Sequence, residues 1–449
     1  MARFLVTCWP FTGHVFPQLS IATALRERGH EVAFYTGEKA RSTIEQAGFP
    51  VFGFSFVDER RVYSLIEVLE RGEPGNRPKP GLLRDTLRHW LVETIPDQVA
   101  DLEPLLRRWR PDVLITDLSM WAPIVVLWQR DHIPVALAST FLGPLIPGPG
   151  APPWGFGLAP ANSAWARLRN RALNRLTDLA ATGVRRRVDA IRAEHDLPPL
   201  GESVNAFTAR LPLYLVGNIP QLDHHRTDLP PTVHYVGPCI WHPPATDTDR
   251  TWMSSIPTDT PWVHVTEGTS HHQSDPFLLR AAVRGLAGEP VQVIATTGTQ
   301  RDPHTLHLDP PAPNIHTTQW LSHTHLLPHC AAVITTGGAA TIMAALQHGK
   351  PLIIVPTTWD KPDNARRITD AGLGITINPK HCTPNRLRTA TQEILTNPTY
   401  RTNAHTIAQH LATTNGPTHA AHLLETLTTH RTAAPEPNHR RALRARRET

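Results

Sequence analysis

Residues 335–365 decide the fold of this chain, and they read TTGGAATIMAALQHGKPLIIVPTTWDKPDNA. The preceding residues, 331–334, are apolar and have the composition of a buried strand, which breaks at Gly337 and Gly338. Residues 339–347 then have the composition of a helix. A helix that starts directly after a glycine turn presents backbone N–H groups and the positive end of its dipole. This arrangement predicts a site for a phosphate group.

A second loop of the same kind follows. Residues 352–355 form another apolar run, which Pro356 ends. A polar cluster comes next, and it consists of Asp360, Lys361, Asp363 and Asn364. In an open α/β sheet, ligands bind outside the carboxyl ends of the strands. We therefore expect both loops to converge on one charged ligand.

The N-terminus has the pattern of a strand, a helix and a second strand. Residues 4–8 and 31–35 are short apolar runs of strand composition. A turn at residues 9–14 leads into the helix, where Pro17 suits the first turn and Gly29 suits the C-terminal end. Such a unit with short strands predicts a parallel sheet and therefore an α/β fold.

Two side chains at strand ends are candidates for acid–base chemistry. His14 follows the first strand, and Asp117 ends the segment RPDVLITD, residues 110–117. A histidine at a strand end suits a general base, because its pKa lies near the working pH. Each residue also fits a structural role, His14 as a loop residue that caps the helix and Asp117 as a helix N-cap. For Asp117 we favour the functional role, since Asp117 and His14 both lie at carboxyl ends of parallel strands.

The length and the charge of the chain limit the classes of protein to which it can belong. A chain of 449 residues is long enough for two domains with separate cores. The net charge is +5, and residues 430–449 contribute six arginines against two glutamates, so the rest of the chain is nearly neutral. This balance argues against a nucleic-acid partner. No stretch approaches the ~20 apolar residues of a membrane span and the N-terminus lacks a signal-peptide pattern, so we expect a cytoplasmic protein without stable membrane insertion.

The sequence offers no convincing metal site. The four cysteines are scattered, and none is in a CxxC pair. His323, His325 and His329 lack the carboxylate or cysteine that would complete a ligand set. The DTD motif at residues 247–249 lies in a proline-rich segment with no strand before it. We therefore expect neither a metal ion nor another cofactor.

Composition divides the chain into two domains, a linker and a tail. Residues 238–260 are rich in proline, threonine and aspartate, and we interpret them as a linker between domains of residues 1–237 and 261–429. Residues 383–427 have the pattern of two amphipathic helices. The basic tail, residues 430–449, has too few apolar side chains to fold and is expected to be disordered.

The quoted stretch resembles the donor-binding signature of the family 1 glycosyltransferases, which have the GT-B fold. The family pattern is roughly HGGxGTxxEAL, then GxPxxxxP, then DQxxNA. The matching positions are Gly337, Gly338, Thr341, Ala345, Leu346, Gly349, Pro351, Pro356, Asp360, Asn364 and Ala365. Four positions depart: Thr336 replaces the histidine, Ala340 the third glycine, Ala344 the glutamate and Lys361 the glutamine.

Two further segments carry the same resemblance, so it extends over most of the chain. Residues 10–34, PFTGHVFPQLSIATALRERGHEVAF, resemble the N-terminal signature of the family, and residues 110–117 resemble its PDLVxxD segment. The resemblance implies two Rossmann-like domains whose parallel sheets face a cleft. The N-terminal domain would bind the acceptor, and the C-terminal domain would bind the nucleotide sugar. The last helix of the chain would pack back onto the N-terminal domain.

The implied activity is that of the bacterial enzymes that glycosylate natural products such as macrolide antibiotics. A sugar would move from a UDP or TDP donor to a hydroxyl of an apolar acceptor with inversion at the anomeric carbon, and without a metal ion. His14 would be the general base, and Asp117 would orient it. The implied donor-binding residues are Gly268, Thr269, Trp320, Thr336, Gly337, Gly338, Ala340, Thr341, Asp360 and Lys361.

Aromatic side chains suit the implied acceptor pocket, although each of them also fits core packing. They are Trp9, Phe11, Trp121, Trp154 and Phe156. Lys361 only donates hydrogen bonds, whereas the family's glutamine also accepts them, so we expect a sugar other than plain glucose, such as a deoxysugar. Two alternatives remain open, a nucleotide-sugar epimerase of the same fold and a non-catalytic partner of a glycosyltransferase. The sequence also leaves open a homodimer or an auxiliary protein.

Overall fold

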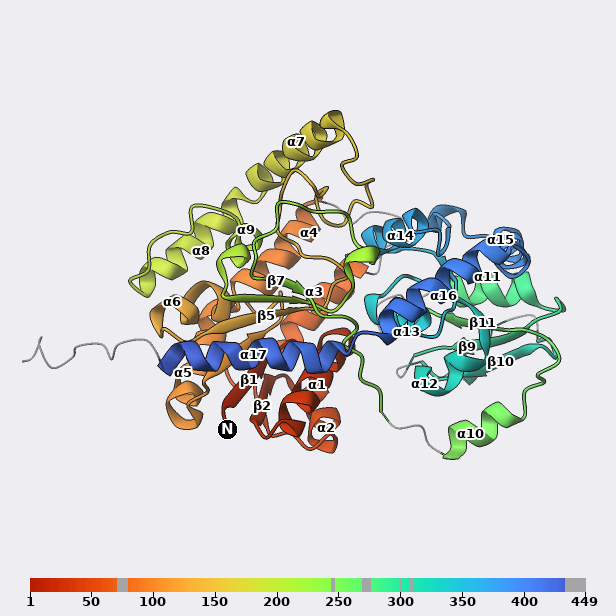
Figure 1. Ribbon diagram of the computed structural model, residues 1–449, viewed down its shortest axis with the longest axis horizontal. Helices are drawn as coiled ribbons and strands as arrows, with labels where there is room; N and C mark the ends of the chain where they lie inside the picture. The colour runs from red at the N-terminus through yellow and green to blue at the C-terminus, as the bar shows by residue number, and fades with distance from the viewer. Residues whose placement is uncertain are drawn as a thin grey trace, which may run out of the picture.

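The computed structural model describes residues 1–70, 80–243, 247–268, 276–298, 301–306, 308 and 311–432. Two parallel β-sheets with surrounding helices build the molecule, and they lie side by side (Figure 1). This arrangement confirms the expected α/β class. Among the described helices, none combines the length and the apolar character that a membrane crossing requires.

The first sheet has seven parallel strands in the order β3-β2-β1-β4-β5-β6-β7. Its strands are β1 (Arg3–Thr7), β2 (Glu31–Thr36), β3 (Val51–Gly53), β4 (Val113–Thr116), β5 (Val135–Ser139), β6 (Leu213–Val216) and β7 (Val233–Tyr235). Successive side chains of β1 enter different cores, because Leu5 packs in one buried cluster and Phe4 and Val6 pack in another. The sheet is therefore covered on both faces, which explains why its strands are continuous apolar runs.

The second sheet has six parallel strands in the order β10-β9-β8-β11-β12-β13. Its strands are β8 (Trp262–Thr266), β9 (Gln292–Thr296), β10 (Ile315–Thr318), β11 (Cys330–Thr335), β12 (Leu352–Ile354) and β13 (Gly374–Thr376). In each sheet the strand order reverses at one place, between β1 and β4 and between β8 and β11. Ligand sites of open α/β sheets lie at such switch points.

Helices connect the strands of the first sheet and extend beyond it. They are α1 (Thr12–Glu27), α2 (Glu38–Gln46), α3 (Glu59–Glu70), α4 (Pro80–Leu87), α5 (Ile95–Trp109), α6 (Trp128–Arg130), α7 (Ala164–Ala180), α8 (Thr182–Glu194) and α9 (Val204–Phe207). The start of α1 differs from the prediction, because the helix begins at Thr12 and Pro17 lies inside it. His14 therefore lies in the first turn of a helix rather than in a loop before it.

The helices of the second half surround the second sheet, except for the last one. They are α10 (Asp247–Ser254), α11 (Phe277–Leu286), α12 (His323–Leu326), α13 (Ala339–Gln347), α14 (Lys361–Asp370), α15 (Pro384–Thr396), α16 (Pro398–Ala412) and α17 (Gly416–Thr432). The prediction of two helices over residues 383–427 was wrong, because three helices occupy this range. The proline-rich segment between the sheets also contains a helix, α10, which the composition did not indicate.

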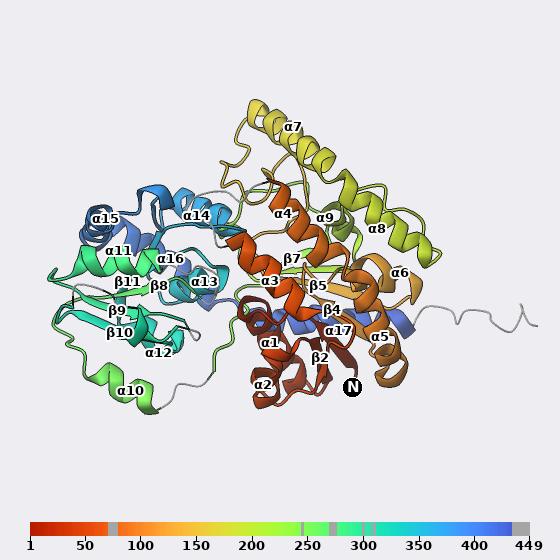
Figure 2. The same cartoon turned by 180° about the vertical axis from the view of Figure 1, so that it is seen from behind.

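The last helix, α17, leaves the second sheet and packs across the first one (Figures 1 and 2). Its buried residues Ala420, Ala421 and Leu424 share a core with α1 and the first sheet. Glu425 of α17 forms an ion pair with Arg28 at 2.5 Å, which fastens the helix to the end of α1. The chain therefore crosses between the two sheets twice, once on the way out and once on the way back.

The two crossings touch each other. A Cβ atom on Gly416, at the start of α17, would collide with the backbone of Gly237 and Pro238, where the chain leaves the first sheet. Gly237 has a φ of 96°, a left-handed conformation that favours glycine. The connection between the two halves is therefore a pair of adjacent backbone segments.

Candidate active site

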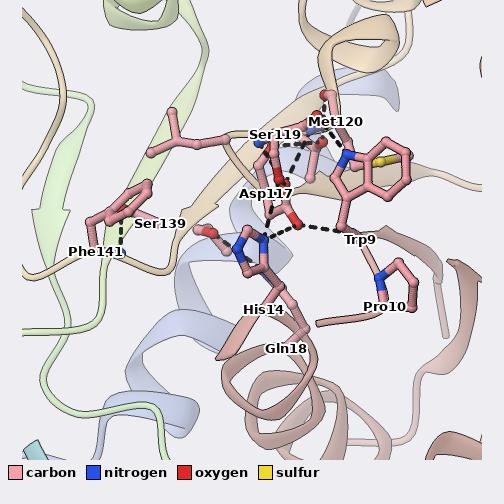
Figure 3. Close-up of polar contacts among 12 residues, drawn as sticks. Trp9, Pro10, His14, Gln18, Asp117, Ser119, Met120, Ser139 and Phe141 are labelled. Carbon is pink, nitrogen blue, oxygen red and sulfur yellow. Dashed lines mark hydrogen bonds and ion pairs between the residues drawn. The ribbon is translucent and has the colours of Figure 1, made fainter. Parts of the chain in front are cut away.

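His14 and Asp117 meet at the switch point of the first sheet. His14 lies in the first turn of α1, which follows β1, and Asp117 follows the neighbouring strand β4. The His14 Nδ1 atom lies 2.9 Å from Asp117 Oδ2 (Figure 3). The Asp117 side chain is fully buried, whereas 18% of the His14 side chain is exposed. The two predicted catalytic residues are thus in contact, and the histidine faces the accessible side.

The Asp117 carboxylate is surrounded by hydrogen-bond donors. One oxygen accepts from the Trp9 amide at 3.1 Å as well as from His14, and the other accepts from the Ser119 amide and hydroxyl, both at 2.6 Å, and from the Met120 amide at 3.1 Å. Burial by itself raises the pKa of this carboxyl group, but the charge and hydrogen bond of His14 and the bonds from Ser119 outweigh it and hold the pKa below its usual range. Asp117 is therefore a stable buried anion.

This anion fixes the tautomer of His14. A carboxylate only accepts hydrogen bonds, so the proton shared with Asp117 is on Nδ1, and the lone pair of the neutral ring is on Nε2. The Ser119 hydroxyl donates to Asp117 and also lies 3.2 Å from His14 Nδ1. Sequence reasoning missed Ser119, although its position two residues after a strand-end aspartate is a usable signal. The arrangement can accept a proton at Nε2 and stabilise the resulting cation.

Aromatic side chains pack around this pair. The Phe11 ring lies 5.3 Å from that of His14, and 5.6 Å from that of Trp90. Trp9 is fully buried, and its indole N–H donates to the Ser119 carbonyl at 2.9 Å. Trp9 and Phe11 therefore pack beside the first turn of α1, which carries His14, and Trp90, which the sequence analysis did not single out, joins them.

A second aromatic group comes from the loop after β5. The Trp154 ring lies 5.8 Å from Phe141 and 6.4 Å from Trp359, and the Trp359 ring lies 5.9 Å from Trp90. Phe156 is 40% exposed. Trp121 is buried and donates its indole N–H to the Leu118 carbonyl, which is a core role. The structure thus joins Trp154 to the aromatic residues near His14 through Trp359, a residue of the other half of the chain.

The loops after β8 and β11 meet at the switch point of the second sheet. The Thr336 hydroxyl donates to the Glu267 carbonyl at 3.0 Å, and Thr336 is buried. Gly268 follows with a φ of 79°. Thr269 lies outside the described residues. The hydroxyl of Thr336 therefore ties the two loops together.

The glycine turn after β11 has a conformation that only glycine adopts readily. Gly337 has a φ of 95°, and a Cβ atom there would lie 2.8 Å from Ile354. Gly338 is the N-cap residue of α13, and no side chain caps this helix. Ala340 is exposed and Thr341 is buried. The first N–H groups of α13 thus have no side-chain cap and are available to bind an anion.

The loop after β12 packs directly on this turn. The Asn364 amide donates to the Gly337 carbonyl at 3.0 Å and to Asp360 at 2.7 Å. Burial raises the pKa of the Asp360 carboxyl, although its bond from Asn364 opposes the rise. The Lys361 ammonium donates to the Thr357 hydroxyl at 3.0 Å. Two of the predicted donor loops are therefore joined through Asn364, which the sequence analysis named only as part of a polar cluster.

The last donor candidate, Trp320, lies two residues after the end of β10 and is half-buried. Among the described residues, no group of three or more His, Cys, Asp and Glu side chains gathers in a way that could hold a metal ion. His323 instead packs its ring on those of His242 and His264, at 5.2 and 5.6 Å.

Comparisons with known proteins show the family to which the chain is related. Residues 283–427 match the family model of the erythromycin biosynthesis protein CIII-like C-terminal domain. The chain is 33% identical to 4'-demethylrebeccamycin synthase of Lentzea aerocolonigenes, over 95% of this chain and 99% of that protein. It is 25% identical to demethyllactenocin mycarosyltransferase of Streptomyces fradiae, over 95% of this chain and 87% of that protein.

Solved structures share the fold at lower identity. The calicheamicin glycosyltransferase CalG4 matches with a TM-score of 0.70 and 20% identity, over 97% of this chain and all of that one. The glycosyltransferase VinC in complex with dTDP matches with a TM-score of 0.66 and 18% identity, over 95% of this chain and all of that one. The two parallel sheets are thus arranged as in these glycosyltransferases.

Proposed function

The chain belongs to the GT-B glycosyltransferases of antibiotic biosynthesis, and from this membership we propose that it is an inverting, metal-independent enzyme that transfers a sugar from TDP or UDP to a hydroxyl of an apolar natural product. The observation that carries the proposal is the contact between His14 Nδ1 and Asp117. A non-catalytic partner would not need a buried carboxylate with five donors behind an accessible histidine. An epimerase that acts on the donor alone would not need a base in the first domain.

His14 is proposed as the general base. Its Nε2 atom removes the proton of the acceptor hydroxyl while the oxygen attacks the anomeric carbon of the donor. The imidazolium that forms is stabilised by the ionised Asp117 carboxylate at 2.9 Å. The attack comes from the face opposite the diphosphate, so the configuration at the anomeric carbon inverts.

The N-terminus of α13 is proposed as the site of the donor diphosphate. The uncapped N–H groups after Gly338 and the helix dipole supply a positive field that also stabilises the leaving diphosphate. Gly337 allows close approach of the backbone to the phosphates. Because backbone groups provide this field, the reaction as proposed requires no metal ion.

The aromatic group near His14 is proposed to contact the acceptor. The indole N–H groups of Trp90 and Trp154 are buried and have no hydrogen-bond partner among the described residues. A buried N–H without a partner is costly, so these donors suit an acceptor that brings oxygen atoms to them. An apolar ring system with hydroxyl or carbonyl groups has both required properties.

The donor is proposed to be a TDP or UDP sugar, and the VinC complex with dTDP supports the thymidine nucleotide. Asp360 and Lys361 would contact the sugar. The Lys361 ammonium only donates hydrogen bonds, which favours a deoxysugar over a sugar whose hydroxyls need an acceptor as well. Trp320 is proposed to stack on the base.

Nucleotide binding followed by transfer tests the proposal. We expect TDP or UDP, but neither GDP nor ADP, to raise the thermal midpoint by a few degrees, since ligand at 100 times its Kd adds roughly 2.7 kcal/mol. Transfer is then measured with a panel of TDP and UDP sugars and hydroxylated aromatic acceptors by mass spectrometry. His14→Ala should abolish transfer and leave the nucleotide-dependent shift intact, whereas His410→Ala, an exposed histidine on α16, should leave both unchanged. A protein that no nucleotide stabilises would contradict the proposal.

A further inference from the structure

Helix α14 contacts both halves of the molecule with different faces. Asp363 and Arg367, four residues apart on α14, both contact the N-terminal half, as does Trp359, which lies two residues before the helix begins. Asn364 donates to the Gly337 carbonyl of the glycine turn and to the carboxylate of Asp360, the N-cap residue of the helix. Residues spaced by four share one face of a helix. The same short helix therefore faces the donor site on one side and the first domain on the other.

Asp363 holds the loop that carries Trp154. Its two carboxylate oxygens accept from the amides of Gly155 at 2.6 Å and Gly157 at 2.7 Å. Asp363 is buried, with 8% of its surface exposed. Gly157 has a φ of 62°, and a Cβ atom there would lie 3.0 Å from the Pro362 carbonyl. The loop and the helix are thus fitted to each other at van der Waals distance, and the helix supplies the acceptor for both amides.

Arg367 holds the end of the first sheet. Its guanidinium donates to Asp223 at 2.8 Å, and the two side chains are 13% and 3% exposed. The Tyr235 hydroxyl, at the end of β7, donates to the other oxygen of Asp223 at 2.6 Å. Removing one member of a buried pair leaves an unpaired charge, so such a contact is held tightly. The pair therefore fixes α14 in position relative to the first domain.

Trp359 adds an apolar contact in a strained conformation. Its φ of 61° is rare for a bulky residue that is not glycine. The ring is held between those of Trp90 and Trp154, at 5.9 and 6.4 Å. Backbone strain of this kind persists only where the surroundings enforce it, and it is concentrated at functional sites. The residue directly before Asp360 is thus part of the aromatic group on the acceptor side.

We propose that Asp363 and Arg367 are positioning residues, which dock α14 on the first domain and thereby set Asp360 and Lys361 against the acceptor loop of residues 154–157. The inference rests on the proposed function, because it assigns Asp360 and Lys361 to the donor sugar. The sugar of the donor, but not its nucleotide, would then be held through a contact with the other domain. The nucleotide would be bound by the second domain alone.

Two conservative substitutions and one matched control test the proposed role of Asp363 and Arg367. Asp363→Asn replaces one of the two accepting oxygens by a donor, and Arg367→Lys loses the guanidinium geometry. Arg366→Lys is the control, because Arg366 pairs with Asp370 at 2.6 Å within α14. The Kd of TDP is measured by calorimetry, and KM for the TDP sugar and kcat are measured with the acceptor found for the unaltered protein.

We expect the substitutions to weaken binding of the TDP sugar but not binding of TDP. In Asp363→Asn and Arg367→Lys, KM for the TDP sugar should rise at least tenfold and kcat should fall, while the Kd of TDP changes less than twofold. The control should leave all three values within twofold. The exchange Asp223→Arg with Arg367→Asp should restore part of the lost kcat/KM relative to Arg367→Asp alone. Gly157→Ala, which disturbs the same contact from the other domain without changing charge, should reproduce the rise in KM.

The opposite results are equally clear. Equal loss of TDP and TDP-sugar affinity would overturn the inference, as would a lowered thermal midpoint with unchanged KM and kcat, because both indicate a contact that only stabilises the fold. If Arg367→Lys does not fold, Asp363→Asn and Gly157→Ala decide between these outcomes. Failure of the proposed function is distinguishable, since the unaltered protein would then neither bind TDP or UDP nor transfer a sugar.

Discussion

His14 Nδ1 and Asp117 Oδ2 lie 2.9 Å apart, although 103 positions of sequence separate the two residues. The strand order explains their contact, because β1 and β4 are hydrogen-bonded neighbours whose carboxyl ends lie at the same edge. The Asp117 carboxylate also binds the Trp9 amide at 3.1 Å, so it fixes the backbone of the turn that carries His14. Asp117 therefore fixes both the orientation of the His14 ring and the backbone of the turn that leads into α1.

The first prediction concerns this carboxylate. Asp117→Asn should lower kcat by about 10²-fold or more, because an amide cannot stabilise the imidazolium and can present its NH₂ group to Nδ1, which forces the wrong tautomer. Asp112→Asn is the control, since Asp112 accepts from the Arg3 amide at 2.8 Å at the opposite end of the same strand. Steady-state kinetics and the TDP-dependent shift are measured for both. Near-normal kcat in Asp117→Asn would exclude the proposed role.

Ser119 provides a more graded prediction. Its hydroxyl donates to Asp117 at 2.6 Å, and removal of one hydrogen bond to a charged group costs roughly 1.5–3 kcal/mol. Ser119→Ala should therefore lower kcat by about ten- to a hundredfold, while the backbone amides still hold the carboxylate. Ser119→Thr retains a hydroxyl and should recover most of the activity. If Ser119→Ala and Ser119→Thr are equally slow, the effect is steric and the hydroxyl has no role.

The donor preference is predicted to depend on Lys361. Lys361→Gln introduces a group that also accepts hydrogen bonds, so it should shift the preference from a TDP deoxysugar toward TDP-glucose by about tenfold in relative kcat/KM. Competition between the two donors, followed by mass spectrometry, measures the ratio directly. Lys350→Gln, which affects a lysine bound to the Pro328 carbonyl, should leave the ratio unchanged. If Lys361→Gln leaves the ratio of the two kcat/KM values unaltered, this position does not determine which sugar is preferred.

Two buried histidines, His242 of the linker and His264 of the second domain, predict that the protein is less stable in acid. Burial lowers the pKa of His264 to about 3 and that of His242 to about 4, compared with an ordinary value of 6.5. Both are therefore neutral in the folded state, while the unfolded chain binds protons below pH 6.5. Their contribution to stability is fully present above pH 6.5 and is lost as the pH falls from 6.5 toward 4 and 3.

The measurement is the urea midpoint between pH 7.5 and 4.5. His264→Leu should lower the stability at pH 7.5, because it removes the bond to Thr296, but should flatten the decline below pH 6.5 by up to about 1.4 kcal/mol per pH unit. His410→Ala should keep the steeper decline of the unaltered protein. Parallel curves for His264→Leu and the unaltered protein would show that His264 does not cause the acid sensitivity.

Much of the fold could be predicted from sequence because parallel strands are buried on both faces. The apolar runs at residues 4–8, 31–35 and 352–355 stand out from their surroundings, and each became a strand within a residue or two. Helix α13 has the predicted bounds, because the glycine turn and His348 enclose a run of good helix formers. The class of the fold follows from these local patterns alone.

Helix boundaries were less predictable, because a single residue can suit more than one position. Pro17 suggested a helix start, yet α1 begins five residues earlier with bonds from His14 and Val15 to the Phe11 carbonyl. The break between α15 and α16 depends on Asn397, whose side chain caps the new helix at the Thr399 amide. An asparagine followed by proline signals the start of a new helix. Here the helical periodicity continues on both sides of the pair, so the break was not recognised.

The contacts that α14 makes with the first domain could not be predicted. Asp363 reaches an amide 208 positions away, and Arg367 reaches a carboxylate 144 positions away. The sequence places Asp363 in a polar cluster without indicating its partner, and Arg367 belongs to no recognised pattern, because both roles come from the packing of two separately folded units. The role of Trp359 could not be predicted either, because nothing in the sequence indicates its positive φ or its contacts with two other tryptophans.

The return of α17 to the first sheet has a consequence for recombination between related genes. The 17 residues of α17 complete the core of the first domain, so that domain is encoded by two separate stretches of the gene. A hybrid protein made with one crossover in the linker would pair a first domain with a foreign α17. A hybrid with a second junction near Gly416 would return the native helix to its own core. Exchange of the second domain between such proteins therefore requires two junctions, one in the linker and one before α17.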